Sequence, residues 1–167
     1  MKHSILCIAI IFIKFAFSQN CPTGLEKVEA VDTSLEKEIL RLVNIERENA
    51  GLPAFEWQEN LAYAARYHAK DMAEDDYFEH DSYDLVNGEL VKSCGTSERI
   101  KKFYQSRSAY AENISAHSTA ASIVEAWMNS PGHKANILSN KTKYVGIGFY
   151  KNESSTYKTY SVQCFGN

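Results

Sequence analysis

Three side chains of this 167-residue chain could form one chemical site: His80, Glu112 and His133. Imidazole binds metals and exchanges protons near neutral pH, and a carboxylate can orient an imidazole or take a proton from water. No short motif joins the three, because they are expected in a loop, a strand and the start of a helix. From the residues alone, a single histidine in a loop such as His80 is more often a surface residue, and Glu112 in a strand could simply face water.

His133 lies at a sharply specified corner within residues 122–138, SIVEAWMNSPGHKANIL. Apolar residues at helical spacing predict an amphipathic helix before this corner. They are Ala120, Ile123, Val124 and Trp127. Ser130 can cap the next helix, and Pro131 suits its first position, where no backbone N–H is needed. We therefore expect His133 in the first turn of a short helix, where its imidazole would be held rigidly.

Two longer amphipathic helices are expected in the first half of the chain. The first begins at a capping box that starts at Thr33, and it ends at Gly51. The second covers about residues 58–75, and its inner stripe includes His68. We interpret His68 as a core histidine bonded to a backbone carbonyl. The acidic residues 74–76 are interpreted as a solvated helix end rather than a calcium site.

The middle of the chain shows less regular patterning. Residues 83–108 are the least regular part, with a short helix expected over residues 97–104. Residues 110–116, YAENISA, alternate in a way that is typical of a strand, with Glu112 and Ile114 on the same side.

The C-terminal part predicts a β-hairpin. Residues 145–150 alternate apolar side chains with glycine, residues 152–155 turn the chain, and residues 160–164 return. Gly146 and Gly148 would allow another group to approach the first strand closely, or would mark a bulge. Helices outnumber strands, which indicates an α+β fold with an antiparallel sheet covered by helices.

Composition bounds the class of protein. The chain is 44% hydrophobic and 23% charged, as expected for one ordinary globular domain with a real core. Its formal net charge of -3 and sequence pI of about 6.0 come without a basic stripe. The sequence therefore gives no indication of nucleic-acid binding.

The N-terminus predicts a secretory signal peptide over residues 1–18, with a positive start, an apolar run and small residues at the cleavage site. Lys14 interrupts the run, which argues against a permanent membrane span. A lipoprotein with Cys21 acylated is the weaker alternative, because no small residue precedes that cysteine. Residues 19–32 would then form a short leader and residues 33–167 a single domain.

Export implies an oxidising compartment. Removal of the signal leaves three cysteines, Cys21, Cys94 and Cys164, so at most one bridge forms and one thiol is left over. A Cys21–Cys164 bridge would tie down both ends of the domain, and a Cys94–Cys164 bridge is as plausible. The sequence does not decide between them.

The segment EAWMNSPGHKANIL resembles the hallmark of the bacterial-type CAP domain, the SCP or pathogenesis-related-1-like superfamily of cysteine-rich secretory proteins. The resemblance continues through ERENAGLPAFEWQENLAYAARYHAKDMA, FEHDS, YAENI and YVGIGFY, in the family's order, and covers roughly residues 35–165. It implies a three-layer α–β–α sandwich with a small antiparallel sheet between helices.

The resemblance also implies a cleft lined by two histidines and two acidic residues, and its segments place His80, Glu112 and His133 there. In family members that bind zinc, the two histidines are the ligands. The glutamate could orient the bound water, accept its proton or hold an imidazole. The family's second glutamate is replaced here by Ser130. The nearest acid, Glu125, is either a solvated helix residue or a further member of the cleft.

These features favour a secreted or extracytoplasmic CAP-domain protein with no transmembrane span in its mature chain. Its cleft would bind a small ligand, a metal ion or an extracellular lipid or protein partner without turnover. The alternative is a zinc-dependent hydrolase acting on peptides or cell-wall material, with a metal-bound water as nucleophile and Glu112 as base. The incomplete set of acids favours binding, and neither HExxH nor GxSxG is present.

Overall fold

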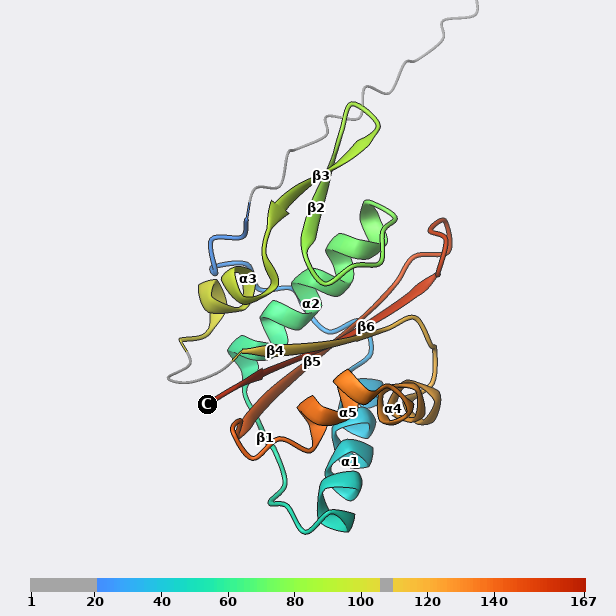
Figure 1. Ribbon diagram of the computed structural model, residues 1–167. Helices are drawn as coiled ribbons and strands as arrows, with labels where there is room; N and C mark the ends of the chain where they lie inside the picture. The colour runs from blue at the N-terminus through green and yellow to red at the C-terminus, as the bar shows by residue number, and fades with distance from the viewer. Residues whose placement is uncertain (1–20, 106–109) are drawn as a thin grey trace, which may run out of the picture.

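A four-stranded sheet separates two layers of helices (Figure 1). The structure is a computed structural model that describes residues 21–105 and 110–167. The predicted signal peptide, residues 1–18, lies outside the described residues. The elements, in chain order, are α1 (Thr33–Asn49), β1 (Glu56–Trp57), α2 (Glu59–Glu74), β2 (Ser82–Val86), β3 (Glu89–Cys94), α3 (Thr96–Phe103), β4 (Ala111–Ser115), α4 (Ala120–Asn129), α5 (Pro131–Ile137), β5 (Tyr144–Lys151) and β6 (Thr159–Gly166).

The strand order of the sheet is β1-β5-β6-β4. The predicted C-terminal hairpin forms its centre, because β5 and β6 pair antiparallel, and β4 joins β6 in the same sense. The predicted antiparallel sheet is confirmed for β4, β5 and β6, and it carries one parallel pair at its edge, between β1 and β5. A strand of two residues is too short to show any periodicity in the sequence.

Each face of the sheet is covered by its own set of helices, as the sandwich prediction requires. Helices α2 and α3 pack on one face. The core on that side includes Leu61, Ala65, Met72, Ile100, Phe103, Ile114 and Val162. Helices α1, α4 and α5 cover the other face. The core there includes Ile39, Val43, Ile123, Trp127, Ile137, Ile147 and Phe165. Among the helices of the described residues, none is both long and apolar enough to cross a bilayer.

Two glycines of β5 let the backbone of α2 lie directly on the sheet. A Cβ at Gly146 would be 2.0 Å from the backbone nitrogen of Ala62, and one at Gly148 would be 2.2 Å from that of Arg66. The prediction that these glycines permit a close approach is confirmed. The contact fixes the distance between α2 and the sheet.

The corner at His133 forms as predicted, with Pro131 as the first residue of α5 and His133 in its first turn. The expected cap is wrong in detail, since the Ser130 side chain makes no capping hydrogen bond. The start of α1 also differs, because Asp32 caps it by accepting a hydrogen bond from the backbone nitrogen of Leu35 at 2.9 Å.

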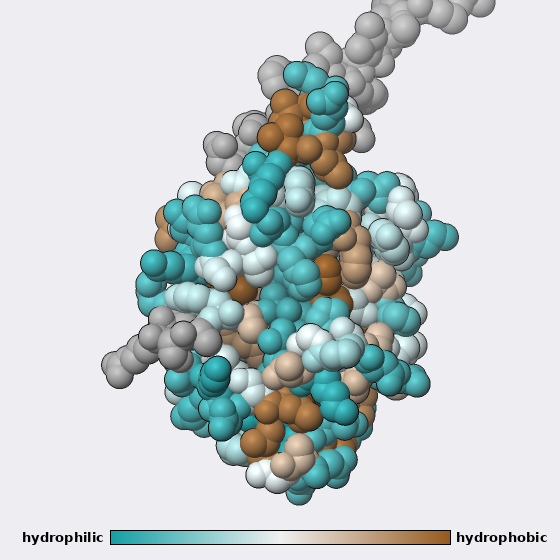
Figure 2. Space-filling view, in the orientation of Figure 1, coloured by the Kyte–Doolittle hydropathy of each residue, from teal (hydrophilic) through white to brown (hydrophobic). Residues whose placement is uncertain are grey.

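The segment predicted to be irregular contains a second hairpin, formed by β2 and β3. Its turn is Asn87-Gly88, with φ of 52° and 88°, the positive values that tight hairpin turns require. The side chains near the tip are aliphatic and 38–49% exposed, and they form a brown patch on the projecting hairpin in Figure 2. They are Leu85, Val86, Leu90 and Val91.

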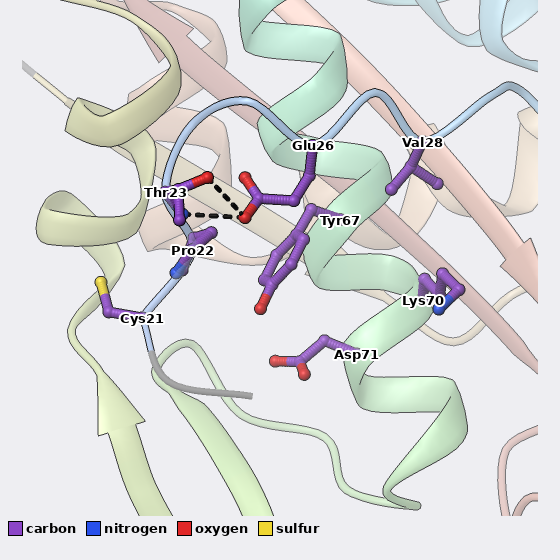
Figure 3. Close-up of a pocket in the computed structure, with 8 residues that line it drawn as sticks. All are labelled: Cys21, Pro22, Thr23, Glu26, Val28, Tyr67, Lys70 and Asp71. Atoms are coloured by element: carbon purple, nitrogen blue, oxygen red, sulfur yellow. Dashed lines mark hydrogen bonds between the residues drawn. The ribbon is translucent and has the colours of Figure 1, made fainter. Parts of the chain in front are cut away.

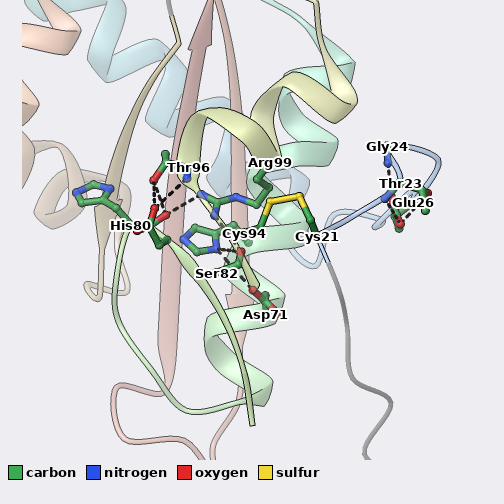
Figure 4. The surroundings of a disulfide bond; sticks show 12 residues. Cys21, Thr23, Gly24, Glu26, Asp71, His80, Ser82, Cys94, Thr96 and Arg99 are labelled. Carbon is green, nitrogen blue, oxygen red and sulfur yellow. Dashed lines mark hydrogen bonds and ion pairs between the residues drawn. A yellow bond between two sulfur atoms is a disulfide. The ribbon is translucent and has the colours of Figure 1, made fainter. Parts of the chain in front are cut away.

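The disulfide joins Cys21 to Cys94, with the two Cα atoms 4.8 Å apart (Figure 4). Neither pairing considered from the sequence forms, because Cys164 is buried in the central strand β6. The expectation of one bridge and one remaining thiol is confirmed.

The leader after Cys21 runs along α2 and is locally ordered by Glu26 (Figure 3). One carboxylate oxygen of Glu26 accepts hydrogen bonds from the backbone nitrogen and the hydroxyl of Thr23, each at 2.9 Å. A cavity of about 390 Å³ lies between this leader and the side chains of Tyr67, Lys70 and Asp71.

The close contact between the backbones of α2 and β5 predicts that a side chain added at this contact lowers the stability of the fold. Gly148→Ala should lower the free energy of unfolding by more than about 2 kcal/mol, because the new Cβ meets backbone rather than a flexible side chain. Gly132→Ala is the matched control, since a Cβ there would have no neighbour within 4 Å. It should stay within about 1 kcal/mol of the parent. Chemical denaturation of both variants measures the difference in the free energy of unfolding. Equal stabilities would contradict the close backbone contact between α2 and β5.

Candidate functional site

Glu112 is the centre of the candidate site, although its side chain is only 1% exposed. It projects from β4 on the face covered by α2 and α3. The carboxylate oxygen Oε1 accepts a hydrogen bond from Nδ1 of His80 at 3.1 Å. The other oxygen, Oε2, accepts one from Nη2 of Arg99 at 2.5 Å. Both carboxylate oxygens are therefore engaged within the protein.

Arg99 is fully buried on α3 and connects three parts of the chain (Figure 4). Besides Glu112, it donates to the backbone carbonyl of His80 at 3.0 Å and to the hydroxyl of Ser82 at 2.9 Å. Thr96, at the start of the same helix, donates its hydroxyl to the same carbonyl at 2.8 Å. The loop that presents His80 is thus held by both its side chain and its backbone.

His68 supports this loop from below. Its Nε2 lies 2.9 Å from the carbonyl oxygen of Glu79 and 3.8 Å from Oε1 of Glu112. The interpretation of His68 as a core histidine bonded to a backbone carbonyl is confirmed. Burial lowers the pKa of His68, which favours a neutral ring that donates to Glu79.

Glu112 is held in its ionised form. Burial by itself would raise the pKa of its carboxyl, but the positive charge of Arg99 and the hydrogen bonds from His80 and Arg99 outweigh burial and lower the pKa to about 2. A carboxylate with so low a pKa is a weak proton acceptor near neutral pH. Its position suits the orientation of His80.

The two candidate imidazoles lie side by side. The ring centroids of His80 and His133 are 6.0 Å apart, and the side chain of His80 is 48% exposed. The hydrogen bond to Glu112 raises the pKa of His80, whereas burial and then the neighbouring His80 lower the pKa of His133. The structure therefore brings together the three residues that the sequence singled out.

Amide side chains fasten α5, which carries His133, to β4, which carries Glu112. Asn113 donates to the backbone carbonyl of His133 at 3.2 Å. Asn136 donates to the side-chain oxygen of Asn113 at 2.9 Å and to the carbonyl of Glu112 at 3.2 Å. These bonds set the distance between the two histidines.

Glu125 does not join the other three. It is exposed on α4 and lines a groove between α1 and α4, whose lining includes none of the other site residues. The second acid expected in the cleft is therefore placed elsewhere, and Glu112 is the carboxylate that contacts His80.

The His80–His133 pair is not part of a cluster of three closely spaced metal-donor atoms among the described residues. Within the described residues, two groups offer three closely spaced donor atoms, and neither contains His80 or His133. In the first, Cys21 and Cys94 are joined as a disulfide, so they are not thiolate ligands. The two histidines fit a partial metal site, because Glu112 engages Nδ1 of His80 in the way that carboxylates orient metal-bound imidazoles.

Removal of the Arg99 charge is predicted to destabilise the fold. Arg99→Met leaves Glu112 buried without its cation, and the free energy of unfolding should fall by about 3–5 kcal/mol. The double variant Arg99→Met/Glu112→Gln should recover part of this loss. Lys101→Met, an exposed cation on the same helix, serves as control. Urea denaturation measures the free energy of unfolding of each variant. A loss of stability for Arg99→Met no larger than that for Lys101→Met would refute the role of the ion pair.

Acid should remove the stability that Glu112 contributes. The carboxyl has a pKa of about 2 in the fold against 4.5 as the ordinary value, so the unfolded chain binds the proton first. The contribution is complete above pH 4.5 and disappears as the pH falls towards 2, with a size on the order of 3 kcal/mol.

Denaturation measured from pH 6 down to pH 2.5 tests this expectation. Glu112→Gln should show a shallower loss of stability than the parent, so that the two curves approach each other in acid. Glu125→Gln should follow the parent, because its carboxyl is exposed. Parallel curves for the parent and Glu112→Gln would contradict the prediction.

Comparison with known proteins relates this architecture to a family. The family model described as the Cysteine-rich secretory protein family, CAP, matches residues 40–165. The chain is 32% identical over 124 residues to the uncharacterized protein YkwD of Bacillus subtilis, covering 73% of this chain and 45% of that protein. It is 32% identical over 125 residues to the uncharacterized membrane protein YlbC of the same organism, covering 74% and 34%. The chain thus spans less than half the length of either relative.

Solved structures show the same fold. An extracellular protein of Bacillus anthracis that contains an SCP domain is 29% identical, with a TM-score of 0.67 over 82% of this chain and 41% of that one. An outer surface protein of Borrelia burgdorferi is 23% identical, with a TM-score of 0.66 over 84% of this chain and 98% of that one. The family match, the shared fold and the residues at the SPGH corner agree: this chain belongs to the CAP, or cysteine-rich secretory protein, family.

Proposed function

We propose that this chain is an extracytoplasmic binding protein whose His80–His133 pair binds a metal ion, a small ligand or an extracellular partner without turnover. Glu112 orients His80 in this pair, and Asn113 holds the backbone of His133. The observation that carries the proposal is the engagement of Glu112. Its two oxygens are bound to His80 and Arg99, so the exposed chemistry of the site is that of two imidazoles.

A zinc-dependent hydrolase is supported less well. It needs a group that takes a proton from the metal-bound water. Glu112 is buried, paired with Arg99 and has a pKa of about 2, so it suits the positioning of His80. Glu125 lies in another groove, and the buried hydroxyl of Ser82 accepts a hydrogen bond from Arg99.

Zinc is the metal that the family implies, and the residues present fit it in part. Nδ1 of His80 is engaged by Glu112, which leaves Nε2 of that ring for a metal, and His133 would supply a second nitrogen. When bound, zinc would supply Lewis acidity at this surface. Within the described residues no third protein ligand joins the two imidazoles, and such a pair suits an exchangeable metal better than a closed structural site.

An extracytoplasmic location is supported by the disulfide between Cys21 and Cys94, since such bonds persist in oxidising compartments. The description of the family as secretory agrees with it, as does the extracellular Bacillus anthracis protein of the same fold.

Zinc titration by calorimetry tests the site. We expect one-to-one binding that is abolished in His80→Ala and in His133→Ala. Binding should be weakened about 10–100-fold in Glu112→Gln, which loses the group that orients His80. Glu125→Gln should bind zinc like the parent, because its carboxylate lies in another groove.

Binding that survives both histidine variants would exclude the proposed site. The same proteins should be assayed for hydrolysis of casein and of peptidoglycan, with and without zinc. Zinc-dependent hydrolysis that disappears in His80→Ala would overturn the proposal in favour of the hydrolase.

A further inference from the structure

A cavity of about 470 Å³ lies where the leader, α1, β1 and the start of α2 meet. None of His80, Glu112 and His133 lines it. Its apolar wall includes Ala30, Leu40 and Trp57, and the rest of the lining consists of charged side chains and Thr33. It is therefore a separate concave site with an aromatic wall, the general form of small-molecule pockets.

The inner end of this cavity is a charge network with excess negative charge around the buried Arg66. Arg66, only 6% exposed, binds Glu36 at 2.6 Å and Glu59 at 2.8 Å. One guanidinium thus serves two carboxylates. The cavity lining as a whole also carries more carboxylates than cations. The three carboxylates are those of Glu29, Glu36 and Glu59, and the two cations are Lys37 and Arg66.

Glu59 is the carboxylate of this network that solvent reaches, with its side chain 50% exposed. One oxygen accepts from Arg66, and the other accepts from the indole nitrogen of Trp57 at 2.7 Å. Both oxygens are thereby fixed in orientation and keep further acceptor capacity. A carboxylate held in place beside an indole loses little freedom when a ligand binds.

We propose that this cavity binds a small organic cation, a protonated amine or quaternary ammonium on a short apolar body. The charged nitrogen lies at Glu59, and the apolar body lies against Trp57 and Leu40. Aromatic faces attract cations, and the ring of Trp57 already has the guanidinium of Arg66 at 5.9 Å from its centre. An anion would be repelled by the exposed carboxylate of Glu59. A neutral molecule would leave the excess negative charge of the cavity unpaired.

Benzylamine is a suitable probe, with benzyl alcohol as its neutral counterpart of similar size. Calorimetry and tryptophan fluorescence would follow both ligands. The chain has two tryptophans, and Trp127 is fully buried in the core, so a change in emission reports Trp57. Benzylamine should bind one-to-one and at least about tenfold more tightly than benzyl alcohol, because only the amine matches the charge.

Variants separate the cavity from general surface charge. Glu59→Gln keeps the hydrogen-bonding shape and removes the charge, so benzylamine binding should fall at least about tenfold. Glu56→Gln is the matched control, because this carboxylate is 57% exposed on β1 and lies outside the cavity lining. Leu40→Lys places a competing ammonium in the wall without touching Glu59, and it should also abolish binding. His133→Ala should bind benzylamine normally.

The proposal is overturned by equal affinity for amine and alcohol, by equal losses in Glu59→Gln and Glu56→Gln, or by absence of binding at millimolar benzylamine. Thermal unfolding of each variant confirms that its fold is retained. Because the histidine site is not involved, failure here leaves the zinc titration unaffected.

Discussion

The ion pair between Arg99 and Glu112 is the interaction on which the candidate site depends. It connects α3 to β4 inside the protein, and Arg99 also binds the backbone of the loop that presents His80. Compared with well-packed apolar residues, a buried pair contributes little net stability, since desolvation offsets the attraction of the charges, although removal of one partner alone is costly. Its main effect is positional, because any other arrangement of these elements would leave a charge unpaired in the core.

The ion pair explains why the residues of the site have different roles. The carboxylate of Glu112 positions other groups, since both of its oxygens are bound by His80 and Arg99. His68 holds the loop through the carbonyl of Glu79, and the imidazoles of His80 and His133 lie next to each other nearer the surface. A site built this way presents ligand atoms in fixed positions while keeping its charged group away from water. Such rigidity suits recognition, since little freedom is lost on binding.

Local patterns in the sequence were sufficient to predict the corner at His133, the inner stripe with His68 and the strand with Glu112, because each depends on neighbours in the chain. Arg99 was missed, although it adjoins Ile100 on the inner face of its helix and a buried cation there requires an acid. The hairpin was missed as well, despite the Asn87-Gly88 signal between two similar tripeptides. The disulfide partner of Cys21 could not be predicted, since it depends on where the hairpin lies in space.

The disulfide between Cys21 and Cys94 also determines how a mechanical force would be transmitted through the domain. A force applied at Cys21 and Asn167 passes through the sulfurs directly to the end of β3, so α1 and α2 lie inside a covalent loop and bear no load. The strain reaches β4 at its first residue and β6 at its C-terminal end, where Ala111 lies opposite Phe165, the residue before the end of β6. Strands pulled from the same end separate like a zipper, one pair at a time. The path from Cys94 to β4 runs through α3, which carries Arg99, and the next strand pair is Glu112 with Cys164. Tension would therefore act early on both partners of the ion pair at the candidate site.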